Sequence, residues 1–231
     1  MRGFRSIMAM LLLVGLLSCS TYAADCRHAA YLEGYPDGTI RPEEALTREQ
    51  LAQILYRLLP EEERDKPELC WFSDVSPERW SYAAVSKAAK LGFLYGDTEG
   101  RFCPEAPVAG SELAITLSRI ANTLTGNQDL PELAEAWSER EIRFETGFGW
   151  VMGLRDGIFD AAAPLSRGQT AQIFNDLLDR KPAGLEALLI GMPVFSDNAD
   201  TRSPFFLDLQ EAAVEHTCTQ TENGEVWTGL G

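Results

Sequence analysis

A stretch of 17 residues that occurs three times restricts the possible folds more than any other feature of this sequence. Its copies, at residues 34–50, 96–112 and 153–169, read GYPDGTIRPEEALTREQ, GDTEGRFCPEAPVAGSE and GLRDGIFDAAAPLSRGQ. Their first glycines are 62 and 57 residues apart. A repeat with this period predicts an architecture in which each unit buries its apolar face against its neighbours.

Each copy predicts a tight turn followed by an amphipathic helix. In the first copy Pro36, Asp37 and Gly38 favour a turn, because proline fixes φ and glycine accepts positive φ. Thr47 is a good N-cap for the helix that follows. The predicted helices contain LAQILYRLL, LAITLSRIA and TAQIFNDLL, whose apolar residues fall on one helical face.

Another helix is predicted before the loop in the second and third copies. In the second copy Ser73 or Asp74 can cap this helix, and Gly92 can end it in a left-handed conformation. We expect Trp80, and Trp137 at the same place in the third copy, to lie in the core, because they fall on the apolar stripe of the predicted helix.

The C-terminal segment begins as a fourth copy but does not complete it. Residues 195–197 repeat the FSD of residues 72–74, and a helix is predicted over 204–215. The first copy has only residues 25–33 before its loop, which is short for a helix, so we expect the C-terminal helix to complete it. Cys26 would then approach Cys218, and His28 could meet His216. Asn223-Gly224 predicts a hairpin after that helix.

The repeated stretch resembles a known family. GYPDGTIRPEEALTRE is similar to the loop of S-layer homology repeats, whose pattern runs GYPDGTFRP…ITRAE, and residues 72–96 resemble the helix before that loop. The resemblance implies a mostly α-helical fold of three helix-loop-helix repeats in a pseudo-threefold prism, to which the sequence adds a short C-terminal β-hairpin. The expected boundaries are a signal peptide at 1–24, repeats at 25–66, 67–124 and 125–182, and the partial fourth copy with the hairpin at 183–231.

The resemblance implies binding of cell-wall glycan in grooves between the repeats, with no cofactor and no enzymatic activity. The expected ligand is a secondary cell-wall polysaccharide, such as a pyruvylated one, or peptidoglycan. The family's glycan-binding arginine lies in its TRAE motif, which corresponds to Arg48 in LTRE and Arg167 in LSRG, whereas the second copy has Gly110 there. A guanidinium at a helix N-terminus suits an acidic sugar. The predicted glycan-binding residues are Gly34, Tyr35, Asp37, Gly38, Arg48 and Arg167.

Two alternatives remain open for these residues. Each arginine could instead pair with a nearby carboxylate and hold the loop in place. The whole chain could correspondingly be a structural or protein-docking surface module whose glycan sites have decayed, with another surface protein as its partner.

Composition excludes several other classes of protein. The formal net charge of −15 argues against nucleic-acid binding, which requires a basic face. The sequence contains none of the GxSxG, HExxH or GxxxxGK[ST] motifs, so we expect no catalytic residues. It has two histidines and no CxxC pair, and this pattern predicts no metal site.

The N-terminus predicts export. Arg2 and Arg5 precede an apolar run at residues 7–17 that is short for a membrane span, and Thr21-Tyr22-Ala23 suits cleavage. Cys19 after Leu-Leu-Ser is a weak lipobox, so a lipoprotein is the minor alternative. No later stretch predicts a transmembrane helix. Cleavage leaves four cysteines, which permit two disulfides in three connectivities or free thiols: Cys26, Cys70, Cys103 and Cys218.

Overall fold

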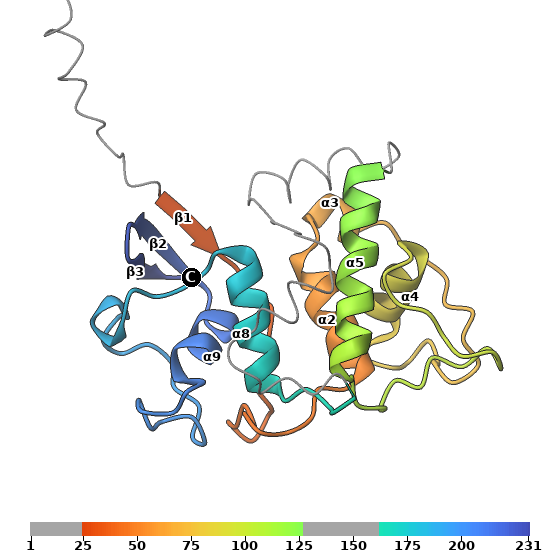
Figure 1. Ribbon diagram of the computed structural model, residues 1–231, viewed down its shortest axis with the longest axis horizontal. Helices are drawn as coiled ribbons and strands as arrows, with labels where there is room; N and C mark the ends of the chain where they lie inside the picture. The colour runs from red at the N-terminus through yellow and green to blue at the C-terminus, as the bar shows by residue number, and fades with distance from the viewer. Residues whose placement is uncertain (1–24, 127–161) are drawn as a thin grey trace, which may run out of the picture.

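The computed structural model describes residues 25–126 and 162–231, which are mostly helical with one small antiparallel sheet (Figure 1). The α-helices are α2 (Arg48–Leu58), α3 (Glu61–Arg64), α4 (Tyr82–Lys90), α5 (Gly110–Gly126), α8 (Arg167–Leu178) and α9 (Phe206–Ala213), and η1 (Leu185–Ala187) is a 3-10 turn. The strands are β1 (Asp25–His28), β2 (His216–Thr221) and β3 (Gly224–Leu230). Trp137 and most of the loop in the third copy lie outside the described residues. Among the described helices, none combines the length and apolar character needed to cross a membrane.

Helices α2 and α8 begin where the sequence predicts. Thr47 and Ser166 each form a capping box, in which the hydroxyl accepts from the backbone N–H of Gln50 or Gln169 and that glutamine's side chain accepts from the cap's own N–H. The apolar face of α2 packs against α4, and α8 packs against α9. Local sequence therefore fixes where these helices start, and burial of one face fixes how they pack.

A closed ring of three backbone hydrogen bonds joins the segments that precede α2, α5 and α8. The Leu46 N–H donates to the Leu165 carbonyl at 2.8 Å, Val108 N–H to Leu46 at 2.8 Å, and Leu165 N–H to Val108 at 2.9 Å. All three side chains are buried in the core. The ring brings the N-termini of three helices around one point, so the short apolar segment before each helix organises the centre of the molecule.

The two described loops are held by the same contact from two FSD triplets. The Asp74 carboxylate accepts from the N–H groups of Phe102 and Cys103, both at 2.7 Å. Asp197 accepts in the same way from Ile40 and Arg41, both at 2.8 Å. Asp74 is therefore not the helix cap that the sequence suggested. Helix α4 begins only at Tyr82, and its N-cap residue makes no side-chain capping bond.

Replacing Asp74 by alanine is expected to lower the free energy of unfolding by about 2 kcal/mol, because two backbone donors lose a charged acceptor. Urea denaturation would measure this loss. Asp200→Ala is the matched control, since Asp200 is exposed and its side chain pairs with the exposed Arg202. Equal effects of the two substitutions would show that the Asp74 contact does not hold the second loop.

Trp80 is not in the core, contrary to the prediction, because 58% of its surface is exposed. The sequence predicted that the helix already includes Trp80, but the backbone there is still in turns. The 3.6-residue period of a helix therefore does not apply to Trp80. Ala84, Val85 and Ala88, which lie within α4, are buried as expected.

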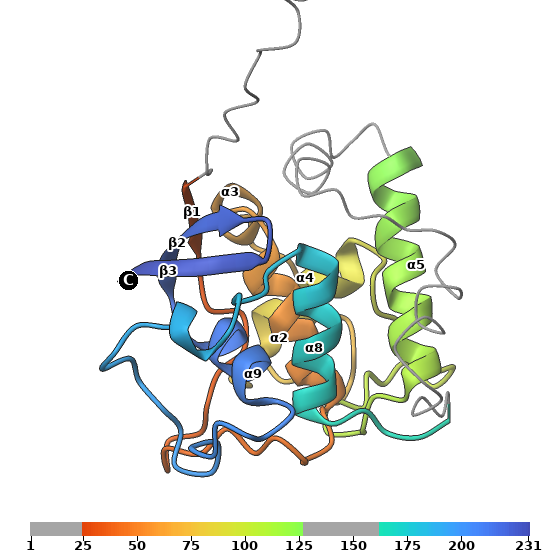
Figure 2. The same ribbon diagram turned by 60° about the vertical axis from the view of Figure 1, so that its left-hand side comes forward.

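The two ends of the described chain meet in the sheet. Strand β1 pairs with β2, which forms with β3 the predicted hairpin, and both Figure 1 and Figure 2 show β1 beside the C-terminal strands. Residues 25–33 thus begin as a strand rather than as a short helix. Cys26 and Cys218 form a disulfide, whereas Cys70 and Cys103 are free thiols and form no second bridge. The N–H groups of Tyr31 and Leu32 both donate to the Ala212 carbonyl of α9.

Candidate functional site

Arg48 and Arg167 occupy the first position of their helices, and each reaches the loop of a different repeated stretch. The Arg48 guanidinium donates from Nε to the Phe102 carbonyl at 2.8 Å and from Nη2 to the Tyr95 carbonyl at 2.5 Å. Arg167 donates from Nε to the Ile40 carbonyl at 2.7 Å and from Nη2 to that of Glu33. Helix α2 therefore supports the loop of the second copy, and α8 supports the loop of the first copy.

Both guanidinium groups are largely withdrawn from solvent. Arg167 is 2% exposed, and the Arg48 side chain is 13% exposed. Burial lowers the pKa of both arginines, which still remain charged at neutral pH. Arg48 also forms an ion pair with Glu112. Both arginines thus hold a neighbouring loop through its carbonyls, and Arg48 in addition pairs with a carboxylate, as the second interpretation of the motif expected.

The predicted site residues do not form a single site, because Arg48 lies with the second loop and Tyr35 with the first. Around Tyr35 the carbon Cζ of Arg41 lies 3.7 Å from the ring centroid, and that of Arg167 lies 5.0 Å from it. The Tyr35 hydroxyl donates to Glu44 at 3.2 Å and accepts from Gln50 at 2.9 Å. We call Tyr35, Arg41, Glu44, Gln50 and Arg167 the first-loop cluster.

The second loop carries a related group of side chains. The carbon Cζ of Arg48 lies 4.6 Å from the centroid of Phe102, and that of Arg119 lies 4.2 Å from the centroid of Tyr95. Asp97 takes the place of Tyr35 in this loop. It accepts from the backbone N–H groups of Glu99 and Arg101 instead of offering a ring. The second loop therefore has aromatic rings with arginines over them but none at the position of Tyr35.

The other three predicted residues shape the first loop. Asp37 accepts from the N–H and the hydroxyl of Thr39, at 3.0 and 2.6 Å, and these bonds lower the pKa of Asp37 to about 2. Gly38 has a φ of 81°, which favours glycine. A Cβ on Gly34 would lie 2.3 Å from the Phe195 ring, so glycine alone fits there without a shift. Asp37, Gly38 and Gly34 thus determine the backbone conformation of the loop that carries Tyr35 and Arg41.

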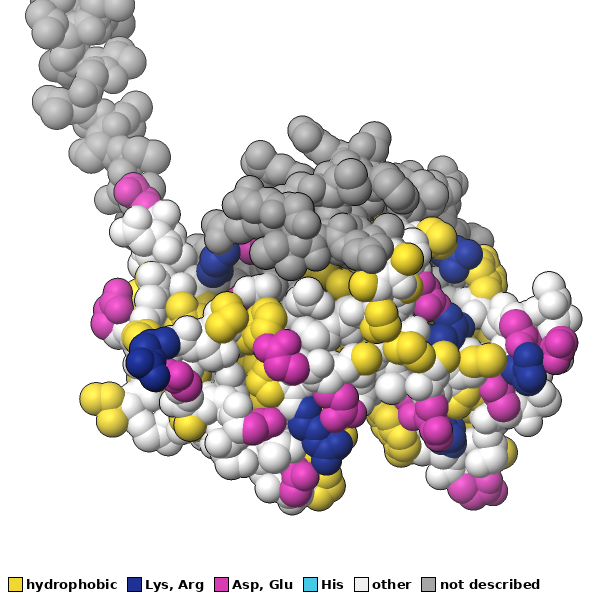
Figure 3. All heavy atoms as spheres, turned by 60° about the horizontal axis from the view of Figure 1, so that its bottom comes forward, with side chains coloured by type: hydrophobic (Ala, Val, Ile, Leu, Met, Phe, Trp, Pro, Cys, Tyr) yellow, Lys and Arg dark blue, Asp and Glu magenta, His cyan; other side chains and the backbone are white. Residues whose placement is uncertain are grey.

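Sequence reasoning missed Arg41 and Arg119 as members of these clusters. Arg41 has a φ of 54°, and the equivalent residue in the second loop is Cys103, so no residue type recurs at that position. Arg41 forms ion pairs with Asp37 and Glu44, both at 3.1 Å, and its side chain is 40% exposed. Figure 3 shows the same pattern on a broader scale, with Lys and Arg side chains lying beside Asp and Glu across one face.

Comparison with known proteins finds a family match that includes the first two copies of the repeated stretch. The S-layer homology domain family matches residues 22–52 and 72–114. A relative named Cell surface glycoprotein 1, from Acetivibrio thermocellus, is 26% identical over 204 residues, which are 82% of this chain and 9% of the relative. The Cellulosome-anchoring protein of the same organism is 24% identical over 86% of this chain and 45% of its own length. An S-layer protein of Bacillus licheniformis is 28% identical over 65% of this chain and 17% of the relative. The chain thus spans less than half the length of each of these three relatives.

Proposed function

Since this chain is an S-layer homology domain protein, we propose that it is a non-catalytic module that attaches non-covalently to secondary cell-wall polysaccharide at the cell surface. The names of its relatives, a cell surface glycoprotein, an anchoring protein and an S-layer protein, support this location. The signal peptide expected at residues 1–24 would supply the export that such a location requires.

The architecture proposed for this role is a pseudo-threefold prism of three repeats at 25–66, 67–124 and 125–182. In it, residues 183–231 complete the first repeat. Three features support it: the hydrogen-bond ring around Leu46, the equal roles of Asp74 and Asp197, and the equal reach of Arg48 and Arg167 into the next loop. Polysaccharide would bind where one repeat meets the loop of the next.

The observation that carries the proposal is the stacking of Arg41 and Arg167 on Tyr35 in the first-loop cluster. A guanidinium fork matches a carboxylate, and the ring on which it stacks holds the guanidinium in place for that contact. Arg41 is the more accessible of the two cations, and the carboxylates of Asp37 and Glu44 now occupy it. An acidic sugar could replace one of these surface partners at little cost, because exposed ion pairs contribute only about 0–1 kcal/mol.

Arg41→Ala is therefore expected to weaken binding of the purified wall polysaccharide by about tenfold or more, which corresponds to the loss of one charged hydrogen bond. Isothermal titration calorimetry would measure the change. Arg101→Ala is the matched control, because Arg101 is an exposed arginine of the second loop that pairs with Asp97 and Glu99. If both variants bind as the unmodified protein does, the first-loop cluster is not the glycan site.

A second candidate function is docking of another surface protein. It is favoured by the use of both helix-start arginines for loop carbonyls, which leaves less of their hydrogen-bonding capacity for a glycan. Exposed large apolar side chains, Leu69, Trp71 and Trp80 among them, suit a protein contact. A protein-docking module should not bind purified wall polysaccharide, and it should retain a surface-protein partner in a pull-down that Trp71→Ser weakens and Arg41→Ala does not.

A further inference from the structure

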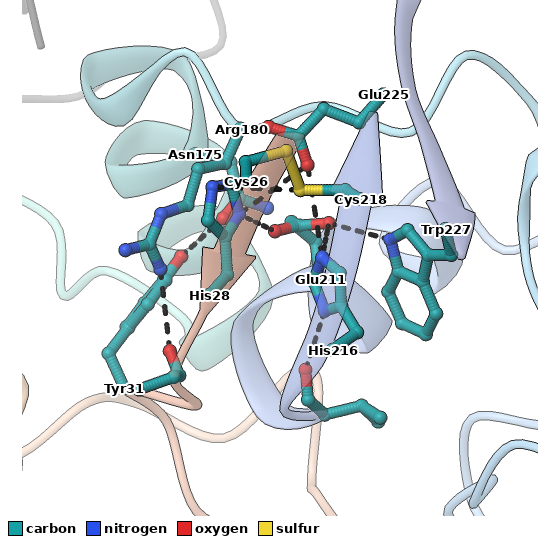
Figure 4. Close-up of polar contacts among 12 residues, drawn as sticks. Cys26, His28, Tyr31, Asn175, Arg180, Glu211, His216, Cys218, Glu225 and Trp227 are labelled. Carbon is teal, nitrogen blue, oxygen red and sulfur yellow. Dashed lines mark hydrogen bonds and ion pairs between the residues drawn. A yellow bond between two sulfur atoms is a disulfide. The ribbon is translucent and has the colours of Figure 1, made fainter. Parts of the chain in front are cut away.

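Four ionisable side chains from four different elements meet in the interior at the seam between the two ends of the described chain. They are His28 of β1, Glu211 of α9, His216 of β2 and Glu225 of β3 (Figure 4). Glu211 and His216 are 0% exposed, Glu225 is 1% exposed and His28 is 9% exposed. We call these four residues the seam cluster.

The ligand atoms of the seam cluster converge on one point. Nδ1 of His28 lies 3.0 Å from Oε1 of Glu211 and 3.4 Å from Oε2 of Glu225. Nε2 of His216 lies 3.3 Å from Oε2 of Glu211 and 3.8 Å from Oε2 of Glu225. One ligand atom from each of the four residues lies within 4.8 Å of the other three. Ligands at about 2.0–2.2 Å from a tetrahedral zinc ion are about 3.3–3.6 Å apart, so the cluster is close to the size of a zinc site.

Two of these atoms are buried and lack a hydrogen-bond partner. They are Nε2 of His216 and Oε2 of Glu225. The other ring nitrogen of His216, Nδ1, lies 2.8 Å from the Val214 carbonyl, which can only accept. Nδ1 therefore donates to that carbonyl, which leaves Nε2 facing the two carboxylates. Nε2 of His216 and Oε2 of Glu225 are then buried polar atoms that need a cation beside them, and either a proton on Nε2 or a metal ion would supply it.

The surroundings of the seam cluster suit a metal ligand set. The Trp227 indole N–H donates to Oε2 of Glu211 at 3.1 Å, and the Trp227 ring stacks on His216 with the centroids 3.9 Å apart. Together with the Val214 carbonyl, these contacts fix the orientation of two ligands, as outer-sphere partners do in metal sites. Figure 4 also labels a buried cation, Arg180, whose Nη1 donates to the Ala29 carbonyl at 3.4 Å.

We propose that the seam cluster binds one divalent transition-metal ion of the zinc class through two imidazoles and two carboxylates. Two carboxylates balance its charge. Nitrogen ligands select such an ion over calcium or magnesium, which prefer oxygen. Four protein ligands leave no open position for substrate, so the site is structural. The metal fastens β1 to α9, β2 and β3, next to the disulfide between Cys26 and Cys218.

The experiment uses the untagged, full mature chain with its disulfide intact, as shown by thiol counting. The chain carries Cys70→Ser and Cys103→Ser so that free thiols cannot bind the probe. After treatment with EDTA and dialysis, ZnCl₂ alone is added. We expect one zinc per chain by elemental analysis and a melting temperature several degrees higher with zinc than without it. Cobalt(II) should give the visible absorption of a tetrahedral site.

His216→Ala should abolish zinc retention, and Glu225→Gln, which keeps the shape of the side chain, should weaken zinc binding by about 10–100-fold or more. Glu215→Gln is the control, because Glu215 pairs with the exposed Arg27 beside the sheet and takes no part in the cluster. The proposal would be overturned if the unmodified protein held no zinc, or if His216→Ala and Glu225→Gln retained zinc as well as the unmodified protein does. Binding seen only after reduction of the disulfide would also overturn it, since the ligands would then be thiolates.

Discussion

Truncation of the chain after Lys181 is expected to abolish cooperative unfolding. The removed segment provides the Asp197 carboxylate that accepts from the N–H groups of Ile40 and Arg41, and the Phe195 ring that packs against Gly34. The removed segment also contains α9, whose Leu209 and Ala212 are 0% exposed, and the hairpin whose strand β2 pairs with β1. Each large apolar side chain that loses its burial costs about 1.5–3 kcal/mol, and a whole domain is stable by only about 5–15 kcal/mol.

Circular dichroism during heating would test this expectation. The truncated chain should show a broad transition without a clear midpoint, and a peptide of residues 182–231 added in trans should restore a sharp one. If the truncated protein melted at the same temperature and as sharply as the full chain, the C-terminal segment would not complete the first repeated unit.

Removal of the disulfide is expected to be the largest effect of any substitution proposed for the chain. Cys26 and Cys218 are separated by 192 residues, so their bond restricts nearly the whole unfolded mature chain. The chain-entropy model assigns about 5 kcal/mol to a loop of that size, as an upper value. The paired variant Cys26→Ser, Cys218→Ser should therefore unfold at a much lower urea concentration.

The variant Cys70→Ser, Cys103→Ser is the matched control, because both of those cysteines are free thiols in the structure. It should unfold within about 1 kcal/mol of the unmodified protein, as surface and half-buried substitutions usually do. If the two double variants lost equal stability, the link between the ends of the chain would contribute little to the fold.

Local features were predicted from the sequence because their causes are local. Thr47 and the Asn223-Gly224 pair determine a helix start and a hairpin through their own backbone preferences, and both are where the sequence predicted. Trp80 shows the limit of the same reasoning. Its apparent position on the apolar face of a helix did not predict burial, because α4 begins only at Tyr82.

The candidate site could be predicted only in part, because its members come from different repeated stretches. Arg48 and Tyr35 lie in the same stretch and seemed to form one site, but each arginine reaches into the next loop, so it is Arg167 that lies beside Tyr35. The seam cluster was also predicted in part. Closure of the chain through its two ends led to the expectation that His28 meets His216, and their ring centroids lie 5.3 Å apart. Glu211 and Glu225 were not predicted, because no spacing rule connects His28 with Glu211, 183 residues away.

The most direct test of the proposed function is co-sedimentation of the mature protein with purified cell-wall sacculi, before and after the acid extraction that removes secondary polysaccharide. We expect the protein to sediment with intact sacculi, to stay in solution with extracted ones, and to lose most of its binding when Arg41 is replaced by alanine. Equal sedimentation with both preparations, or with neither, would contradict attachment through the polysaccharide.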